Sequence, residues 1–172
     1  MKTKKMILYA LFAALTGVCS MISIPLPFTP VPINLATLSV FLAGGLLGAR
    51  GGAISQIVYV FIGAIGLPVF SNFSGGFGVL TGPTGGYIIG YVVAAWITGL
   101  VIGKFGHSYY KNAIGMLVGL AACYTLGTLW FMYVTNMGII ESLFMCIVPF
   151  LIGDGVKIII AAILVKKLHR FV

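Results

Sequence analysis

The stretch PFLIGDGVKIIIAAILV, residues 149–165, holds the most unusual pair of side chains in this sequence. The chain has two acidic residues, and one of them, Asp154, stands three positions before Lys157 in a strongly apolar run. Residues three positions apart share one face of a helix, so the two side chains are expected to lie together. A carboxylate acceptor beside an ammonium donor complements a group with both an N–H and a C=O, such as an amide, a urea or a purine edge.

The depth of this pair in a membrane decides how costly its charges are. Each charge inside hydrocarbon costs at least about 2.5–3.5 kcal/mol on insertion scales, so such residues face a bundle interior or a wet cavity. About 18 Å of helix separate Asp154 from Lys166, where the basic end of the chain begins, at about 1.5 Å per residue. The pair is therefore expected at or beyond the bilayer midplane, on the outer side. It is either a salt bridge that locks the last helix in place or, as we favour, the polar end of a pocket.

A glycine-rich loop is the second place where the sequence offers contacts to a ligand. Residues 66–86, GLPVFSNFSGGFGVLTGPTGG, contain no charged side chain. Backbone amides freed by Gly75 and Gly76, together with Asn72, can hold a carboxylate, while Phe73 can cover an apolar body. The loop is either a flexible external connection or a lid, and long loops with this composition favour the lid.

Three further polar side chains, Gln56, Tyr59 and Tyr87, lie inside apolar segments and either bond within the core or line a pocket. No phosphate-binding GxxxxGK[ST] motif is present, and the three cysteines lack the spacing of metal ligands. His107 and His169 lie at segment ends far from Asp154, so no catalytic triad is expected. The sequence therefore predicts neither an enzyme nor a metal site. A solute moved by this chain is either driven by a partner or moves by facilitation.

The elements that position these residues follow from the composition. Of the 172 residues, 60% are hydrophobic and 7% are charged. A soluble domain carries about 25% charged residues, so this chain is predicted to be a polytopic membrane protein. Proline, glycine and charge clusters divide it into an all-α bundle of six transmembrane helices that forms one domain, residues 1–172. The predicted spans are 4–24, 34–48, 52–67, 84–103, 112–135 and 150–168.

Several connections between these spans are distinctive. The apolar run that follows Lys5 is too long for a secretory signal and has no A-x-A-like site, so it is interpreted as the first span. Four prolines in residues 25–32 end that helix. The second and third spans meet at GARGG, either as a tight hairpin or as two shorter helices. The apolar stretch 138–150 is expected to be re-entrant or interfacial.

The basic residues predict the orientation of the bundle. Lysine and arginine occur before the first span, between the second and third, between the fourth and fifth, and after the sixth. The positive-inside rule then places both termini in the cytoplasm, and Lys157 is the one basic residue that it does not explain. The net charge of +8 does not indicate nucleic acid, because these residues lie at segment ends without a continuous patch in the sequence.

Small residues recur at helical spacing in the first span. Ala10 and Ala14 form one pair, and Ala13 and Gly17 form another. Such pairs let helices approach closely. They serve either packing within the bundle or docking to another membrane subunit. Comparable glycine pairs at 44/48, 86/90 and 115/119 are expected to serve internal packing.

Four segments together resemble the BioY family, the biotin-binding S-components of energy-coupling factor (ECF) transporters. These are PVPINLATLSVFLAGGLLGARGG, YVFIGAIGLPVF, SGGFGVLTGPTGGYIIGY and PFLIGDGVKIIIAAIL. The resemblance covers residues 31–93 and 148–164, and GPTGGY with P-F-x-x-G-D-x-x-K carries most of it. It implies a bundle in the cell membrane of a prokaryote that captures biotin from outside. It also implies docking through the first helix onto a T-component that two ATPases drive.

The resemblance also implies roles for individual residues. Asp154 and Lys157 would contact the ureido ring, while Asn72 and the glycine-rich loop would hold the carboxylate end. Thr84 and Gly85 belong to the matching GPTGGY motif and are included in the predicted ligand site. No arginine follows this motif, so an arginine contact to the carboxylate is not expected.

The sequence leaves three functional hypotheses open. The first is a substrate-capturing subunit for biotin, or for another small vitamin, that needs no cofactor of its own. The second is a membrane enzyme that uses Asp154, for which the sequence supplies only Lys157 and hydroxyl groups as further catalytic groups. The third is a stand-alone facilitator, which would transport without an ATPase partner.

Overall fold

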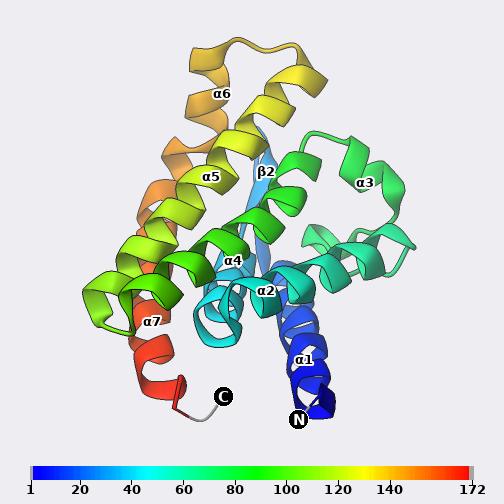
Figure 1. The fold of residues 1–172 in the computed structure, drawn as a ribbon. Helices are drawn as coiled ribbons and strands as arrows, with labels where there is room; N and C mark the ends of the chain where they lie inside the picture. The colour runs from blue at the N-terminus through cyan, green and yellow to red at the C-terminus, as the bar shows by residue number, and fades with distance from the viewer. Residues whose placement is uncertain (1, 171–172) are drawn as a thin grey trace.

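The computed structural model describes residues 2–170, and Met1, Phe171 and Val172 of the predicted domain lie outside the described residues. Figure 1 shows the elements in chain order. They are α1 (Lys2–Met21), β1 (Ser23–Leu26), β2 (Thr29–Asn34), α2 (Ala36–Ala64), the 3₁₀ turn η1 (Ser71–Phe73), α3 (Phe77–Thr81), α4 (Gly85–Phe105), α5 (Tyr109–Thr135), α6 (Ile139–Cys146), the 3₁₀ turn η2 (Val148–Phe150) and α7 (Leu151–Leu168).

The helices confirm the predicted multi-pass, all-α membrane protein. Within residues 2–170, five helical stretches are long and apolar enough to cross a membrane. One of them, α2, contains both the second and the third predicted span. Gly48 divides it. Its backbone has φ 73° and ψ 179°, a conformation that residues other than glycine rarely adopt. Figure 1 shows the change of direction within α2. The two predicted helices therefore meet at a sharp break, and six helical segments form the bundle.

Glycines set the close approach of the neighbouring helices. α4 packs between α2 and α5, with which it makes its most extensive contacts. A methyl group placed on Gly44 would lie 2.5 Å from the carbonyl oxygen of Ala95, and one on Gly119 would lie 2.7 Å from that of Ala94. Gly90 faces Cys123 in the same way, at 2.9 Å from its Sγ. The predicted internal packing of these glycines is confirmed, whereas Gly48 has open space around it and makes the break.

Gly44→Ala is expected to destabilise the fold, because the new methyl group would overlap the backbone of α4. Overpacking of this kind costs about 1–3 kcal/mol, which lowers Tm by about 2–12 °C for a chain of this size. Gly103→Ala in α4 is the matched control, since a methyl group there meets nothing within 4 Å. Thermal unfolding in detergent should separate the two variants. Equal Tm values would show that the contact at Gly44 does not limit how closely α2 and α4 approach.

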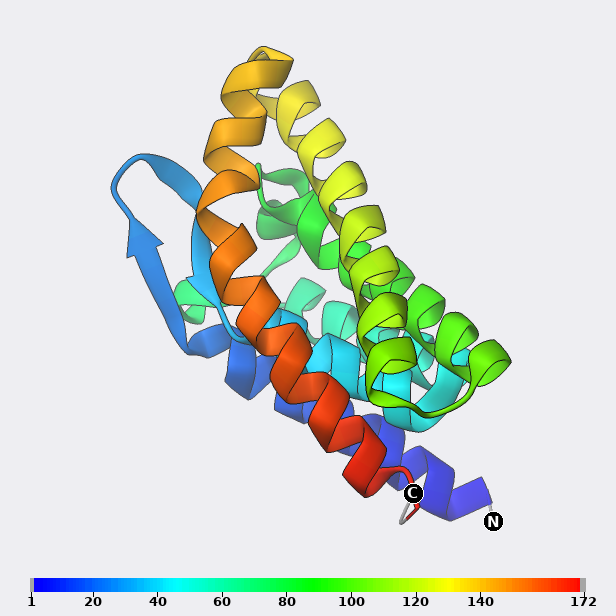
Figure 2. The same cartoon turned by 90° about the vertical axis from the view of Figure 1, so that its left-hand side faces the viewer.

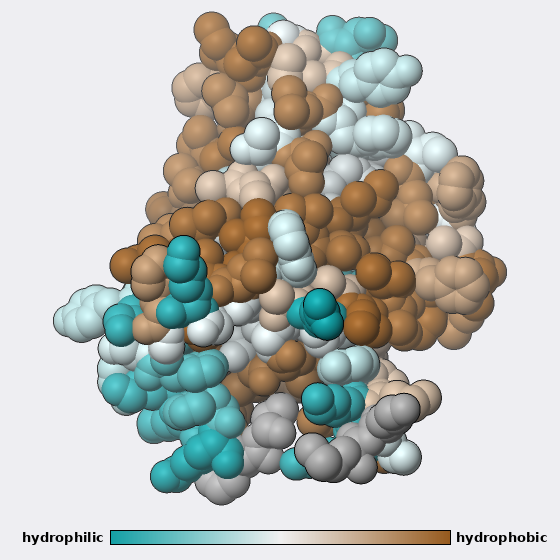
Figure 3. Space-filling model, viewed as in Figure 1, coloured by the Kyte–Doolittle hydropathy of each residue, from teal (hydrophilic) through white to brown (hydrophobic). Residues whose placement is uncertain are grey.

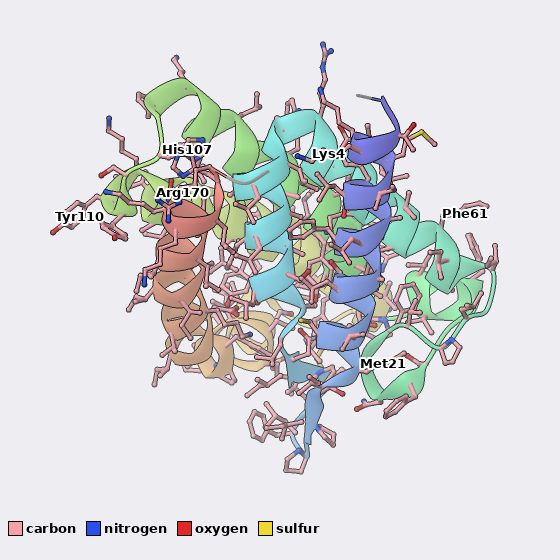
Figure 4. All side chains as sticks on the ribbon, turned by 90° about the horizontal axis from the view of Figure 1, so that it is seen from below. Lys4, Met21, Phe61, His107, Tyr110 and Arg170 are labelled. Atoms are coloured by element: carbon pink, nitrogen blue, oxygen red, sulfur yellow. The ribbon has the colours of Figure 1, made fainter. Side chains whose placement is uncertain are left out.

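Both termini lie at the same end of the bundle (Figures 1 and 2). Hydrophilic side chains gather at this end, and a broad apolar band covers the molecule above it (Figure 3). Figure 4, which views this end, shows Lys4 on α1 and, apart from it, His107 and Arg170 beside each other. By the positive-inside rule this is the cytoplasmic end.

The outer half contains an element that the sequence analysis did not predict. β1 and β2 form an antiparallel hairpin in which Leu26 pairs with Thr29, joined by Pro27 and Phe28. A two-stranded ribbon leaves one edge of each strand unpaired, so prolines are tolerated there. Figure 2 shows the hairpin standing beside the bundle. Residues 138–150 contain α6 and η2, which lead directly into α7 at the end opposite the termini (Figure 1).

Candidate functional site

Asp154 and Lys157 form a buried ion pair in the first two turns of α7. The distance from Lys157 Nζ to Asp154 Oδ1 is 2.8 Å. The two residues are 2% and 7% exposed, so both charges are removed from lipid and from bulk water. An acidic residue near a helix start is also stabilised by the helix dipole. The spacing of three residues thus brings the two groups together as predicted.

Three other elements supply hydrogen bonds to this pair. Thr37, in the first turn of α2, donates to Asp154 Oδ1 at 2.9 Å, and Tyr124 of α5 donates to Oδ2. Lys157 Nζ donates to the carbonyl oxygen of Asn34 at 2.5 Å and to Thr37 Oγ1 at 3.2 Å. The ammonium group therefore has three acceptors for its three hydrogens. A buried pair keeps its charges only when such additional bonds satisfy it.

Asn34 connects the ion pair to the loop that follows α2. Its Nδ2 donates to Ser71 Oγ at 2.8 Å. Ser71 lies 3.3 Å from the hydroxyl of Ser20 in α1, and Tyr59 donates to the same Ser20 oxygen at 3.1 Å. A continuous row of polar groups thus runs from the pair at α7 to α1 across the outer half of the bundle.

These groups surround a cavity of about 200 Å³ in the outer half of the molecule. Among the described residues that line it, Asp154 and Lys157 are the charged ones. Its aromatic lining consists of Phe70, Tyr87, Tyr91, Tyr124 and Phe150. Its hydroxyl and amide lining consists of Ser20, Asn34, Thr37, Ser71, Asn72, Ser74 and Thr84. An apolar space with one charged wall and convergent hydrogen-bonding groups is typical of a small-molecule site.

Three more of the predicted site residues line this cavity with the pair: Asn72, Thr84 and Tyr87. Asn72 accepts a bond from Ser23 Oγ at 2.9 Å, which ties the loop to the hairpin. Tyr87 shares a bond of 2.9 Å with Thr128 Oγ1, so its hydroxyl is held by α5.

The remaining predicted residues lie outside the cavity lining. Gln56 is fully buried and donates to Thr16 Oγ1 at 3.1 Å. Tyr59 lies behind the lining, where its hydroxyl donates to Ser20 and its ring packs against those of Phe70 and Tyr91. Gly85 is buried in the first turn of α4. Phe73 is 68% exposed. Gly75 and Gly76 belong to the loop, where the N–H of Gly76 donates to the carbonyl of Gly63 at 2.7 Å.

Comparison with known proteins identifies the family of this chain. The sequence model of the BioY family matches residues 1–172. The chain belongs to the BioY family. The family that the four sequence segments predict is therefore confirmed.

Two BioY-family relatives match nearly the whole chain. A protein of Pyrococcus horikoshii described as a probable biotin transporter BioY is 39% identical over 169 residues, which cover 98% of each chain. The biotin transporter BioY of Thermotoga maritima is 37% identical, over 97% of this chain and 96% of its own. A crystal structure of the S-component for biotin from an ECF-type ABC transporter superposes with a TM-score of 0.91. It is 30% identical and covers 98% of this chain and 92% of that one.

Sequence reasoning missed several polar lining residues of this BioY-family chain, among them Asn34, Thr37, Tyr91 and Tyr124. The signal for the tyrosines was present, because each interrupts a membrane-spanning run with a polar group that needs a partner. Asn34 and Thr37 gave no such signal. They follow a proline-rich segment, where polar residues are expected at any helix start.

Proposed function

We propose that this chain is the biotin-capturing S-component of an ATP-driven uptake transporter in a prokaryotic cell membrane. The observation that carries the proposal is the buried Asp154–Lys157 pair at the wall of a cavity in the outer half of the bundle. A carboxylate and an ammonium side by side complement a urea, the group at one end of biotin. The relatives described as biotin transporters support the same ligand.

The hydrogen bonds around the pair define how a ureido ring would be held. Asp154 Oδ1 accepts from Lys157 and Thr37, whereas Oδ2 accepts from Tyr124. Oδ2 therefore keeps a lone pair for a ring N–H. The ring carbonyl would accept from Lys157 Nζ in place of Thr37, whose 3.2 Å bond is the longest of the three that the ammonium makes. The other ring contacts would come from the aromatic lining.

The carboxylate end of biotin would lie near the loop that follows α2. The cavity lining has no cation besides Lys157, so hydroxyl and amide donors would hold the carboxylate. Asn72 and Ser74 of the loop and Thr84 are the groups in position, and Ser20 lies on the α1 side. We infer that this end is bound by neutral hydrogen bonds, without a metal or a cofactor.

Calorimetric titration of the detergent-purified protein with biotin tests this function directly. Saturable binding with one site per chain is expected, and a panel of other water-soluble vitamins should compete weakly. Saturable binding of a different vitamin would redirect the proposal to that ligand. Absence of saturable binding by every vitamin in the panel would overturn it. Uptake into vesicles that contain this chain alone would support the stand-alone facilitator, and conversion of the ligand would support an enzyme.

Tyr124→Phe is expected to weaken biotin binding by about tenfold, because Asp154 loses the donor that orients Oδ2 toward the cavity. Tyr133→Phe on the same helix is the matched control, since Tyr133 is 79% exposed. Titration of both variants with biotin measures the effect, and unfolding temperatures show whether the bundle is intact. An unchanged affinity in Tyr124→Phe would show that Asp154 is oriented by its other two donors alone.

We further propose that α1 docks this chain onto a membrane T-component, which two ATPase subunits drive. Ala10 and Ala14 are exposed on α1, and the apolar side chains of Ile7, Leu11 and Val18 flank them. Ala13 is 3% exposed, and a methyl group on Gly17 would touch Val69 at 3.5 Å. The first pair thus offers a surface on which a partner helix can approach, whereas the second pair packs within the bundle. No nucleic acid takes part in this function.

A further inference from the structure

One corner of the cytoplasmic end gathers cations that are far apart in the sequence. Lys104 ends α4, Lys111 lies in the first turn of α5, and Lys166 and Lys167 end α7. We call these four lysines the basic corner. Two contacts join its parts: Lys166 Nζ lies 4.2 Å from the centre of the Tyr109 ring, and the rings of His107 and His169 stack at 4.4 Å.

The basic corner has no acidic side chain to offset it. The chain contains two acidic residues. Asp154 is paired with Lys157 in the cavity, and Glu141 lies in α6 at the opposite end. Burial, and then the neighbouring His169, lower the pKa of His107, so this ring favours the neutral state. Among the described residues, no carboxylate therefore offsets these four lysines, and an anion from outside the chain can do so.

The surroundings of the basic corner match the headgroup level of a bilayer. Lys104, Lys111 and Lys167 are exposed. Tyr110 is 83% exposed beside them, as Figure 4 shows at the edge of this end. Farther along α5 follow the exposed apolar side chains of Ile114, Leu117 and Val118. Tyrosine and lysine above an apolar face are the arrangement that meets lipid phosphate and acyl chain together.

We propose that the basic corner binds the phosphodiester headgroup of an anionic phospholipid from the cytoplasmic leaflet, with an acyl chain along the exposed face of α5. An acidic protein surface would satisfy the charges but would not use the apolar face directly above them. Figure 4 shows His107 and Arg170 on a different side of this end from Lys4 of α1. The basic corner therefore stays open to lipid when α1 is occupied by a partner, and this site is independent of the proposed biotin site.

Lipid titration of the purified full chain tests the proposal. Phosphatidylglycerol and phosphatidylcholine with identical acyl chains are added in detergent, and bound lipid is counted by native mass spectrometry. We expect phosphatidylglycerol to bind at least about tenfold more tightly, with an affinity that falls as NaCl rises. Lys111→Gln with Lys167→Gln should remove most of this preference. Lys4→Gln with Lys5→Gln, at the start of α1, is the control and should keep it.

Equal binding of the two lipids, or equal losses in the two double variants, would overturn the proposal. Glycerol phosphate competing as well as the whole lipid would also overturn it, because the site would then recognise phosphate alone. Binding of an acidic partner subunit at this corner with no lipid preference would assign the surface to protein. Unfolding temperatures without added lipid verify that both double variants are folded, and this readout does not depend on biotin.

Discussion

Asp154→Asn is expected to weaken biotin binding by about 100-fold or more. Removing one partner of a buried ion pair leaves the other charge without compensation, which costs about 3–5 kcal/mol. In this chain the uncompensated charge would be that of Lys157, which is 7% exposed and would keep only neutral acceptors. The asparagine amide has a single oxygen, so it cannot accept from Lys157 and from the ring N–H as the two carboxylate oxygens can. Calorimetric titration with biotin measures the combined effect.

Glu141→Gln is the matched control for this substitution. It removes the only other acidic side chain of the sequence, which is exposed on α6. Its affinity for biotin should equal that of the unmodified protein. Lys157→Ala should weaken binding as Asp154→Asn does, and the double variant should lose less than the two single losses combined, because it leaves no lone charge. Full additivity would show that the two side chains contact biotin independently.

A loss of folding would obscure this result, so a milder variant is needed as well. Thr37→Val keeps the shape of the side chain and both charges, but it removes one donor to Asp154 and one acceptor for Lys157. The unfolding temperature of Thr37→Val should stay closer to that of the unmodified protein than the unfolding temperature of Asp154→Asn does. A loss of about tenfold in biotin affinity is expected from one hydrogen bond to a charged group. Wild-type affinity in a folded Asp154→Asn variant would contradict the proposed ureido site.

The sequence predicts the charged half of this site well, because charge in a membrane is rare and costly. Asp154 and Lys157 stand out against a chain with 7% charged residues, and helical spacing alone places them together. The spans follow for the same reason, since apolar runs and basic ends are visible without tertiary contacts. The break at Gly48 could be predicted only in part. The GARGG sequence marks a break, but only packing against α4 decides how its two sides lie.

The neutral half of the site depends on contacts between distant segments, which the sequence does not show. Asn34 reaches Lys157 because the hairpin carries the chain back to the bundle, and a proline-rich segment predicts only where a helix ends. Gln56 and Tyr59 illustrate the opposite case. They are polar at membrane depth, as a pocket residue would be, but they bond to Thr16 and Ser20 of α1. Polarity within a span marks a need for a partner and does not identify that partner.

The second large effect is expected from a substitution in the small-residue pairs of α1. Ala14→Leu is expected to lower ATP-driven biotin uptake by about tenfold or more, because a bulky side chain would hold a partner helix away from α1. Ala14 is exposed, so the bundle itself tolerates leucine, and biotin binding by the isolated chain should stay unchanged. Uptake by cells and co-purification with the T-component measure assembly, while calorimetry measures binding.

Ala121→Leu is the matched control, because Ala121 is an exposed alanine on α5, away from α1. It should assemble and transport normally. Ala13→Leu should behave in a third way: Ala13 is 3% exposed, so leucine there overpacks the contact between α1 and the rest of the bundle and lowers Tm. If Ala13→Leu instead keeps its Tm and loses the partner while Ala14→Leu assembles, the docking surface is the face of α1 that carries Ala13 and Gly17. The burial of the second pair argues against that outcome, since Ala13 is 3% exposed and Gly17 lies against Val69, whereas Ala14 is exposed.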